Sequence, residues 1–117
     1  MPSVTVEPAD PRPLVDGDVV VGSRCTGCTR PDAWQRERCP ACLGVCVSER
    51  FGPGGIVWSS ADVHLAVGHR EPPFTLAQVD LDDGPRVLVT VRPTGEVPPG
   101  TRVRIVGTDD GDVVVES

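Results

Sequence analysis

The sequence predicts an all-β protein. Its apolar residues are those that favour strands: valine occurs 21 times and isoleucine twice, against six alanines and six leucines. β-branched side chains pack well on a pleated sheet and lose rotamer freedom in a helix. No stretch of about ten residues carries an apolar stripe with helical spacing. Glycine and proline number 13 each, so more than a fifth of the chain interrupts regular structure.

Length and charge bound the classes of protein that remain. The 117 residues suffice for one compact domain or two very small ones, and the net charge is −6 with every one of the 11 basic residues an arginine. No hydrophobic run exceeds three residues, whereas a membrane span needs about 20. Residues 1–22 lack the basic start and apolar stretch of a secretion signal. We therefore expect a cytoplasmic protein, where disulfides are disfavoured.

Composition divides the chain into three segments. Residues 1–22 are acidic and rich in proline, and we expect an extended N-terminal lead-in. Residues 23–50 hold all five cysteines and five arginines, and we expect a zinc ribbon there. Residues 51–117 hold ten acidic residues against five arginines, and we expect a barrel domain.

The third segment predicts five short strands separated by turns. Val87, Val89 and Val91 share one face of a strand, as expected when that face is buried. Residues 82–85 (Asp-Asp-Gly-Pro) and 110–111 (Asp-Gly) predict tight turns. Five strands in about 65 residues match the size of a five-stranded OB-fold barrel. The strands are expected at residues 55–63, 74–81, 86–92, 101–107 and 113–116.

Two Cys-x-x-Cys pairs give the strongest chemical signal: Cys25 with Cys28, and Cys39 with Cys42. The tight turn within a pair aims both thiolates at one ion, and two pairs complete a closed tetrahedral set whose usual occupant is zinc. Closed coordination leaves no position for water, so the zinc would be structural. Iron in a rubredoxin-like site uses the same sulfur ligands. Four free or disulfide-linked thiols are the alternative to a metal.

Cys46 stands outside the two pairs, four residues after Cys42. It alternates with Val45 and Val47 in a strand-like run, residues 45–48, and we expect a small buried side chain. A spare metal ligand or a reactive thiol is the alternative.

No catalytic residue is predicted. His64 and His69 could act as acid, base or ligand, but neither belongs to a pattern such as HxxE, and we expect surface or capping roles. Asp80 and Asp82 are expected near a solvated turn rather than in a catalytic pair. The chain contains no nucleophile elbow, phosphate loop or dinucleotide fingerprint. These observations disfavour an enzyme that acts by itself.

The order of the parts resembles the rubredoxin-like zinc-ribbon plus OB-fold family that is found beside acyl-CoA enzymes. The likeness covers residues 23–108, and its specificity comes from the cysteines, a Pro-Pro-aromatic segment and the pattern VxLxxGPR in this order. The matching positions are Cys25, Cys28, Cys39-Pro40-x-Cys42, Gly52-Pro53-Gly54-Gly55-Ile56, Pro72-Pro73-Phe74 and residues 79–86.

The resemblance implies a role as a non-catalytic accessory or scaffold subunit. Family members look like small subunits or fused domains that bind thiolase-like enzymes, sterol-type thiolases and aldolases, ketosynthase-like acyltransferases or MaoC-type hydratases. It therefore implies a hetero-oligomer in which this chain supports acyl-CoA or acyl-transfer chemistry. The partner would supply the side chains that act on the thioester.

Two features depart from the family pattern. Relatives usually start with an aromatic-rich helical hairpin, whereas this chain has residues 19–24 (VVVGSR) ahead of its first cysteine. Thr29 stands where relatives often have glycine. Any CoA contact or partner docking that the hairpin provides in relatives is therefore not implied for this chain, and the resemblance names no cofactor-binding residue.

The partner interface is expected to use exposed apolar groups of the ribbon together with the loop at residues 68–73. Trp34 is the best single anchor, because tryptophan is the residue type most often found as a binding hot spot. A position in the ribbon core, over the metal, is the alternative for Trp34. The residues nominated for the interface are Trp34, His69, Arg70, Pro72 and Pro73.

A module that binds single-stranded nucleic acid is the second hypothesis, because ribbons and OB folds both occur in such proteins. These proteins need a positive surface for phosphates and aromatic side chains for stacking. Residues 51–117 carry a net charge of −5, which disfavours this function. Arg102 and Arg104 would be its best residues.

Overall fold

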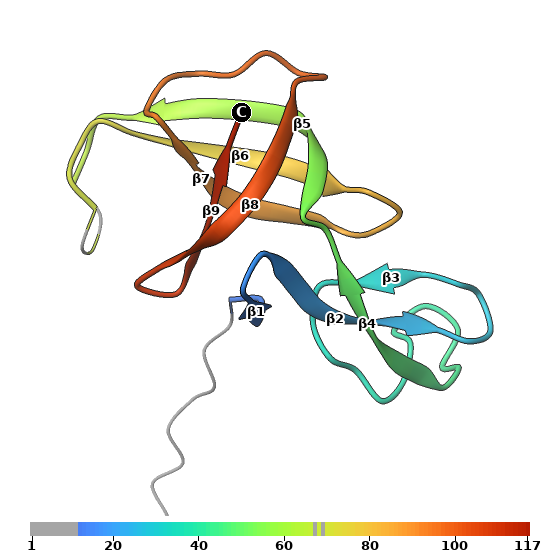
Figure 1. Ribbon diagram of the computed structural model, residues 1–117. Coiled ribbons are helices and arrows are strands. Elements are labelled where there is room, and N and C mark those ends of the chain that lie inside the picture. The colour runs from blue at the N-terminus through green and yellow to red at the C-terminus, as the bar shows by residue number, and fades with distance from the viewer. Residues whose placement is uncertain (1–11, 67, 69) are drawn as a thin grey trace, which may run out of the picture.

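The computed structural model describes residues 12–66, 68 and 70–117. They form a small sheet and a barrel, and the chain passes from one to the other between β4 (Cys46–Phe51) and β5 (Gly54–Val63) (Figure 1). The described residues are strands, turns and loops, which confirms the all-β prediction. None of them forms a helix that is long and apolar enough to cross a membrane.

The ribbon is a four-stranded antiparallel sheet built around its longest strand, β2. Strand β4 pairs with β2 along its whole length, from Val20 opposite Phe51 to Cys25 opposite Cys46. Two short strands, β1 and β3, also pair with β2. The strands are β1 (Val15–Asp16), β2 (Val19–Cys25), β3 (Pro31–Asp32) and β4 (Cys46–Phe51).

Part of the predicted N-terminal lead-in belongs to the ribbon sheet. Of the lead-in that the sequence predicts at residues 1–22, residues 1–11 lie outside the described residues, whereas 15–16 and 19–22 lie in strands of the ribbon sheet. The reason is the valine run at 19–21, in which Val20 has no exposed surface and belongs to the hydrophobic core. A buried valine of this kind stabilises a strand rather than a frayed segment.

The second body is a closed five-stranded barrel with the strand order β5-β6-β7-β9-β8. Neighbouring strands are antiparallel except β7 and β9, which are parallel. This is the arrangement of the predicted OB-fold barrel, and each strand lies within two residues of its expected bounds. The strands are β5 (Gly54–Val63), β6 (Phe74–Leu81), β7 (Arg86–Arg92), β8 (Arg102–Asp109) and β9 (Asp112–Glu116).

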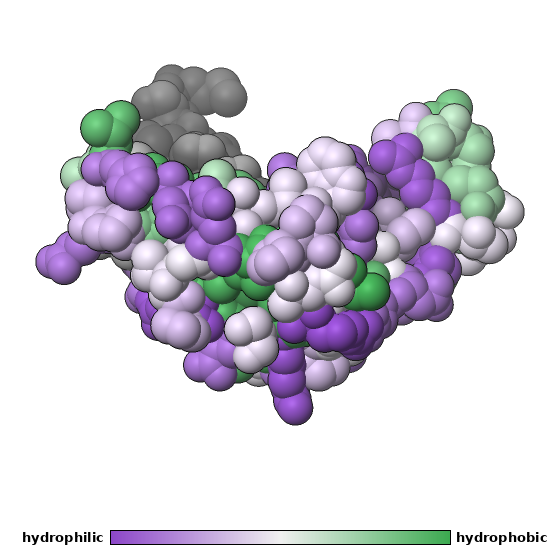
Figure 2. Space-filling model, turned by 90° about the horizontal axis from the view of Figure 1, so that it is seen from above, coloured by the Kyte–Doolittle hydropathy of each residue, from purple (hydrophilic) through white to green (hydrophobic). Residues whose placement is uncertain are grey.

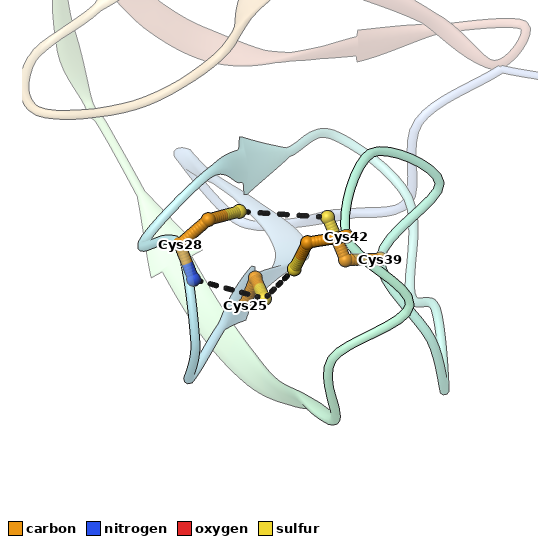
Figure 3. Close-up of side chains that lie close together, drawn as sticks. All are labelled: Cys25, Cys28, Cys39 and Cys42. Atoms are coloured by element: carbon orange, nitrogen blue, oxygen red, sulfur yellow. Dashed lines mark hydrogen bonds between the residues drawn. The ribbon is translucent and has the colours of Figure 1, made fainter.

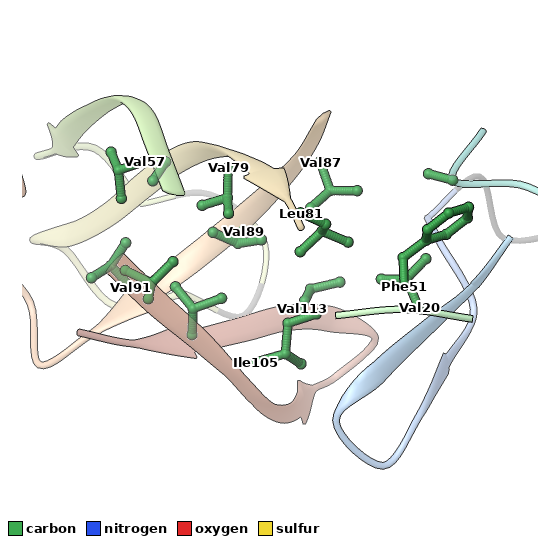
Figure 4. Close-up of a cluster of buried hydrophobic side chains, with 14 residues drawn as sticks. Val20, Phe51, Val57, Val79, Leu81, Val87, Val89, Val91, Ile105 and Val113 are labelled. Atoms are coloured by element: carbon green, nitrogen blue, oxygen red, sulfur yellow. The ribbon is translucent and has the colours of Figure 1, made fainter. Parts of the chain in front are cut away.

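One hydrophobic core runs through both bodies (Figure 4). Alternate valines of β7 point into the barrel, as the sequence predicts for Val87, Val89 and Val91. The same cluster continues into the ribbon through Val20, Ala33 and Phe51. The two bodies therefore pack as one unit.

The predicted turn after β6 holds the barrel against the ribbon. Its amide at Gly84 donates to the carbonyl of Leu81 at 2.9 Å, and Gly84 lies against the Phe51 ring, which a Cβ would meet at 2.8 Å. The Arg24 side chain of the ribbon reaches across and donates to the Asp83 carbonyl at 2.6 Å. A glycine is required at position 84 because the aromatic ring occupies the space of a side chain.

Candidate metal centre and interface groove

The two Cys-x-x-Cys pairs form knuckles with matching backbone geometry. The amide four residues after the first cysteine donates back to that cysteine's carbonyl: Thr29 to Cys25 at 3.1 Å, and Leu43 to Cys39 at 2.8 Å. Thr29 and Leu43 both have a positive φ, 65° and 63°. The left-handed residue turns the chain sharply after each pair, so both sulfurs of a knuckle point to the same side.

The structure brings the four sulfurs together (Figure 3). The Sγ atoms of Cys25, Cys28, Cys39 and Cys42 all lie within 4.8 Å of one another. Across the two knuckles, the Cys25 and Cys42 sulfurs are 3.4 Å apart and those of Cys28 and Cys39 are 3.6 Å apart. Four metal–sulfur bonds of about 2.3 Å place tetrahedral sulfurs about 3.8 Å apart. The described cluster therefore has the size of a four-sulfur metal cage.

Hydrogen bonds from backbone N–H groups favour the thiolate form of two of the cysteines. Hydrogen bonds from the amides of Cys28 and Gly27 lower the pKa of Cys25 to about 6. In the second knuckle, the backbone N–H of Cys42 lowers the pKa of Cys39 in the same way. An N–H group that points at sulfur favours the charged form of the thiol.

The Cys28 sulfur responds to the other sulfurs of the cluster. The N–H of Arg30 lowers the pKa of Cys28, but hydrogen bonding with the sulfurs of Cys39 and Cys42 raises it, and the pKa reaches about 11. Like charges this close oppose one another's ionisation. A cation at the centre would remove that opposition, so the chemistry of this donor set fits a bound metal ion.

Packing around the sulfurs leaves no room for further groups on one side of the cluster. Cys25 and Cys39 are each 1% exposed, whereas Cys28 and Cys42 lie at the surface. A Cβ on Gly44 would lie 2.9 Å from the Cys25 sulfur and 3.2 Å from the Cys42 sulfur. The loop approaches the cluster this closely only because residue 44 has no side chain.

Cys46 is a neighbour of the four-sulfur cluster but not a member of it. It pairs with Cys25 across β2 and β4, so its side chain is partly buried beside the cluster. Burial raises the pKa of the Cys46 thiol. These facts agree with the expectation of a small buried side chain and argue against a reactive thiolate.

The predicted acidic residues lie in ion pairs rather than in a catalytic site. Asp80 accepts two hydrogen bonds from Arg86, at 2.7 and 3.1 Å, and Asp82 accepts two from Arg102, at 2.8 and 2.7 Å. The arginines lower the pKa of both carboxyl groups. His64 is exposed just after β5, and His69 lies outside the described residues.

A groove of about 390 Å³ separates Trp34 of the ribbon from the outer face of β6 and β7. The Trp34 side chain is 45% exposed, while its backbone is held by Ser23, which donates to the Trp34 carbonyl at 2.7 Å. Arg70 lines the same groove, so two of the nominated interface residues come together. We call this surface the Trp34 groove and define it by Trp34, Arg12, Arg70, Leu76, Arg86 and Leu88.

The nominated residues Pro72 and Pro73 lie beside this groove. Pro73 lines a second, more polar cleft of about 300 Å³ that shares Arg70 with the Trp34 groove, and Pro72 is exposed next to it. Sequence reasoning missed Leu76 and Leu88. Both are leucines at outward-facing positions of β6 and β7, and an apolar residue at such a position is the signal that could have identified them.

The edge of the ribbon carries further exposed apolar side chains. Leu43, Val45 and Val47 are 72%, 50% and 49% exposed. Figure 2 shows hydrophobic surface gathered at the ribbon end of the molecule. The expected exposed apolar groups of the ribbon are therefore present at its surface.

Comparison with known proteins gives a likeness of fold. By sequence, the chain matches no protein-family model and no curated protein. Among solved structures it is similar to a chain of the "Ltp2-ChsH2(DUF35) aldolase", with a TM-score of 0.64 and 21% sequence identity. The match covers 84% of this chain and 82% of that chain. It therefore includes both the ribbon and the barrel.

Proposed function

We propose that this chain is a non-catalytic accessory subunit that docks on a thiolase-like or ketosynthase-like enzyme and supports its acyl-CoA or acyl-transfer chemistry. The observation that carries the proposal is the likeness in fold, across both bodies, to a DUF35-type chain solved as part of an aldolase. A rigid ribbon joined to a barrel through one core is suited to docking, because little conformational entropy is lost on binding.

The metal that we propose is one structural zinc ion, held by Cys25, Cys28, Cys39 and Cys42. Four thiolates in a tetrahedral set suit zinc, and the distances between the sulfurs agree with this geometry. Zinc would supply folding free energy to the ribbon rather than a reacting group. Metal analysis and the visible spectrum of the purified protein distinguish zinc from iron, because only the iron site is coloured.

The partner would supply the reacting groups. Among the described residues, the carboxylates of Asp80 and Asp82 are engaged by arginines, which leaves them poorly suited to proton transfer near neutral pH. We propose that this chain instead offers the Trp34 groove as its docking surface. Its tryptophan and arginine side chains belong to the residue types enriched in binding hot spots.

The ion pairs of the barrel argue against the nucleic-acid function. Arg102 is bound by Asp82 through two hydrogen bonds, and Arg104 lies 3.3 Å from the carboxylate of Asp18. Phosphate binding would require both arginines to leave these partners, in a chain with a net charge of −6.

The proposal is tested by co-expression of this chain with thiolase-like enzymes from the same genome. We expect the enzyme to gain acyl-transfer activity and solubility in the complex. Trp34→Ala should weaken the complex by about 2 kcal/mol, roughly 30-fold in Kd, with the metal content unchanged. Val106→Ala is the control, since Val106 is a comparably exposed apolar side chain of the barrel outside the groove.

Two results would contradict these assignments. If the enzyme is fully active without this chain, the accessory role is wrong. If Trp34→Ala loses the metal, then Trp34 belongs to the ribbon core and the interface has to be sought elsewhere.

A further inference from the structure

We propose that the open edge of strand β7, at residues 86–89, takes up an extended apolar segment of the partner enzyme as an additional β-strand. The inference deepens the proposed function and rests on it for the identity of the partner. It is carried by main-chain groups that the barrel leaves unpaired, by the side chains beside them and by the shape of the surrounding surface.

Strand β7 uses only part of its length to close the barrel. Its antiparallel pairing with β6 covers residues 86–91, whereas its parallel pairing with β9 covers residues 90–92 alone. Among the described residues, no strand pairs with residues 86–89 on the side away from β6. Strands β7 and β9 therefore part at this point and leave an open edge.

The alternation of the β6–β7 ladder determines which main-chain groups point into this edge. The Leu81 amide donates to the Pro85 carbonyl at 3.1 Å, so these two residues form a hydrogen-bonded pair. Hydrogen-bonded pairs recur at every second residue of an antiparallel ladder. Val87 and Val89 therefore bond to β6, whereas the N–H and C=O groups of Leu88 point away from it.

The main-chain groups of Leu88 are open to an incoming strand. Within the part of the chain that the structure describes, no group is hydrogen-bonded to them. Leu88 is 54% exposed and lines the Trp34 groove, so solvent reaches this part of the edge. An unpaired strand edge is a template for another extended segment, and peptide-binding domains use such edges for β-strand addition.

The side chains at the edge favour an apolar guest. A guest residue directly opposite Leu88 places its side chain on the same face as the leucine. The guest residues before and after it point to the other face, beside Val87 and Val89, which also line the groove. The neighbouring Arg86 already donates two hydrogen bonds to Asp80, at 2.7 and 3.1 Å. Three successive apolar residues therefore suit this edge better than charged ones.

The position of the edge favours a segment of another protein over the β7 edge of a second copy. The edge lies in a groove of about 390 Å³ whose lining comes from the ribbon as well as from β6, β7 and β9. Paired strands lie about 4.8 Å apart. A single extended segment can enter the groove and reach this distance, whereas a second barrel would meet the ribbon first.

Hydrogen exchange of the free chain tests the edge itself. In the ¹⁵N-labelled monomer, followed by NMR, the Leu88 amide should exchange about 100-fold faster than the amides of Val87 and Val89, which are bonded to β6. Slow exchange of Leu88 in the monomer would mean that the edge is already paired and would overturn the proposal. Dimers that protect Leu88 would mean that a second copy occupies the edge, and would overturn it too.

A synthetic peptide, Thr-Val-Leu-Val-Thr, tests strand addition without the enzyme. At millimolar concentration it should slow the exchange of the Leu88 amide about tenfold and shift the NMR signals of residues 86–89. The same peptide with an N-methyl group on its leucine cannot donate to the Leu88 carbonyl and should have no effect. Equal effects of the two peptides would reduce the binding to apolar contact and overturn the proposal.

Two variants of Leu88 test the edge in the complex with the thiolase-like enzyme. Leu88→Pro removes the N–H that the guest strand needs and leaves the ladder with β6 intact. Leu88→Ala keeps the N–H and shortens the side chain. We expect the Kd to rise about tenfold or more for Leu88→Pro and about threefold or less for Leu88→Ala. The metal content and the melting temperature of both should stay close to those of the natural chain.

Val89→Pro is the control for the geometry of the ladder. It removes an N–H that is bonded to β6, so it should lower the melting temperature sharply. An equal loss in Leu88→Pro would mean that the Leu88 amide belongs to the ladder, which would overturn the proposal. Natural affinity of a folded Leu88→Pro chain for the enzyme would overturn it as well. If the peptide protects Leu88 but no enzyme binds the natural chain, the strand site stands and the proposed function fails.

Discussion

Thr29 has a strained backbone conformation in the first knuckle. It adopts a φ of 65°, which β-branched residues rarely do, and its hydroxyl donates to the carbonyl of Cys28 at 2.6 Å. The corresponding residue of the second knuckle, Leu43, is unbranched at Cβ and has nearly the same φ. The turn geometry that a Cys₄ site requires is thus obtained without the glycine that usually provides it.

Replacement of Thr29 by glycine should stabilise the protein. The left-handed conformation costs an ordinary residue about 1–2 kcal/mol, and glycine gives back part of this through its greater freedom in the unfolded chain. We expect the free energy of unfolding to rise by about 0.5–1 kcal/mol in urea denaturation.

Thr26→Gly is the control within the same knuckle. Thr26 has no positive φ, and its hydroxyl donates to the Val45 carbonyl at 2.8 Å. Its replacement should destabilise the protein by about 1 kcal/mol. If both variants are destabilised equally, the strain at Thr29 is not real.

Substitution of a cysteine of the cluster and substitution of its neighbour Cys46 should differ in their effect on the metal content. Cys39→Ser should lose the metal and most of the ribbon's fold, because one of four thiolates is gone from a site that stabilises folding. Cys46→Ala should keep one metal per chain, since its sulfur lies outside the cluster. Metal analysis of both proteins, with circular dichroism, checks the contrast. Equal metal loss would make Cys46 a ligand.

At the scale of the element, strand β2 depends on a glycine at position 22. A Cβ there would lie 2.0 Å from the carbonyl oxygen of Asp32, at the point where β3 pairs with β2. Because the obstacle is backbone, the two strands would have to separate.

Gly22→Ala should therefore destabilise the ribbon by about 2–3 kcal/mol. Gly27→Ala is the matched control in the same ribbon, because its Cβ would meet the sulfurs of Cys25 and Cys42 at an ordinary 3.7 Å. That change should stay within about 0.5 kcal/mol. Thermal unfolding measures both variants, and similar melting temperatures would mean that β3 is not held this closely.

The ion pair that joins the turn after β6 to β8 predicts a pH dependence. Hydrogen bonds from Arg102 lower the pKa of Asp82 below its ordinary value of 3.8. A carboxyl group whose pKa is lowered by folding stabilises the protein above its unfolded pKa, and that contribution is lost as the pH falls through the folded pKa.

Asp82→Asn should therefore be less stable than the natural chain at pH 7 and equally stable near pH 2. The effect should be modest because both side chains are exposed. Denaturant titrations at both pH values measure the stability of the variant and of the natural chain. A difference in stability that persists near pH 2 would mean that the ion pair is not its cause.

For the whole molecule, Phe51 couples the ribbon to the barrel. Its ring is 3% exposed, lies against Gly84 of the barrel and is covered by the Arg24 guanidinium, 5.5 Å from the ring centre. Phe51 also ends β4, directly before the link to β5. The side chain is thus the main apolar contact from the ribbon to the turn after β6.

Phe51→Ala should cost about 3–5 kcal/mol and should divide one unfolding transition into two, one for each body. Calorimetry shows the number of transitions. Trp58→Ala, an exposed aromatic of the barrel, should retain a single transition. A single transition in Phe51→Ala at a lower temperature would mean that other contacts suffice to couple the bodies.

The predictable parts of this protein are those that short stretches of sequence determine. Two of the five barrel strands, 74–81 and 86–92, have the expected bounds, because alternation and turn residues are local signals. The cysteine spacing likewise predicted which four sulfurs lie together in the structure. Residues 15–16 and 19–22 of the predicted lead-in form strands instead, because the proline and acid content of this segment concealed the buried Val20.

By itself, the sequence determined the class of the fold, the order of its two bodies and the four cysteines of the cluster, since each follows from residues at most a few turns apart. The tertiary structure decided the rest. It placed Trp34 opposite Leu88 to make a groove, joined Phe51 to the barrel core and paired Arg102 with Asp82. These contacts connect distant segments through packing, which depends on how the closed barrel and the ribbon sheet meet and leaves no periodic pattern in the chain.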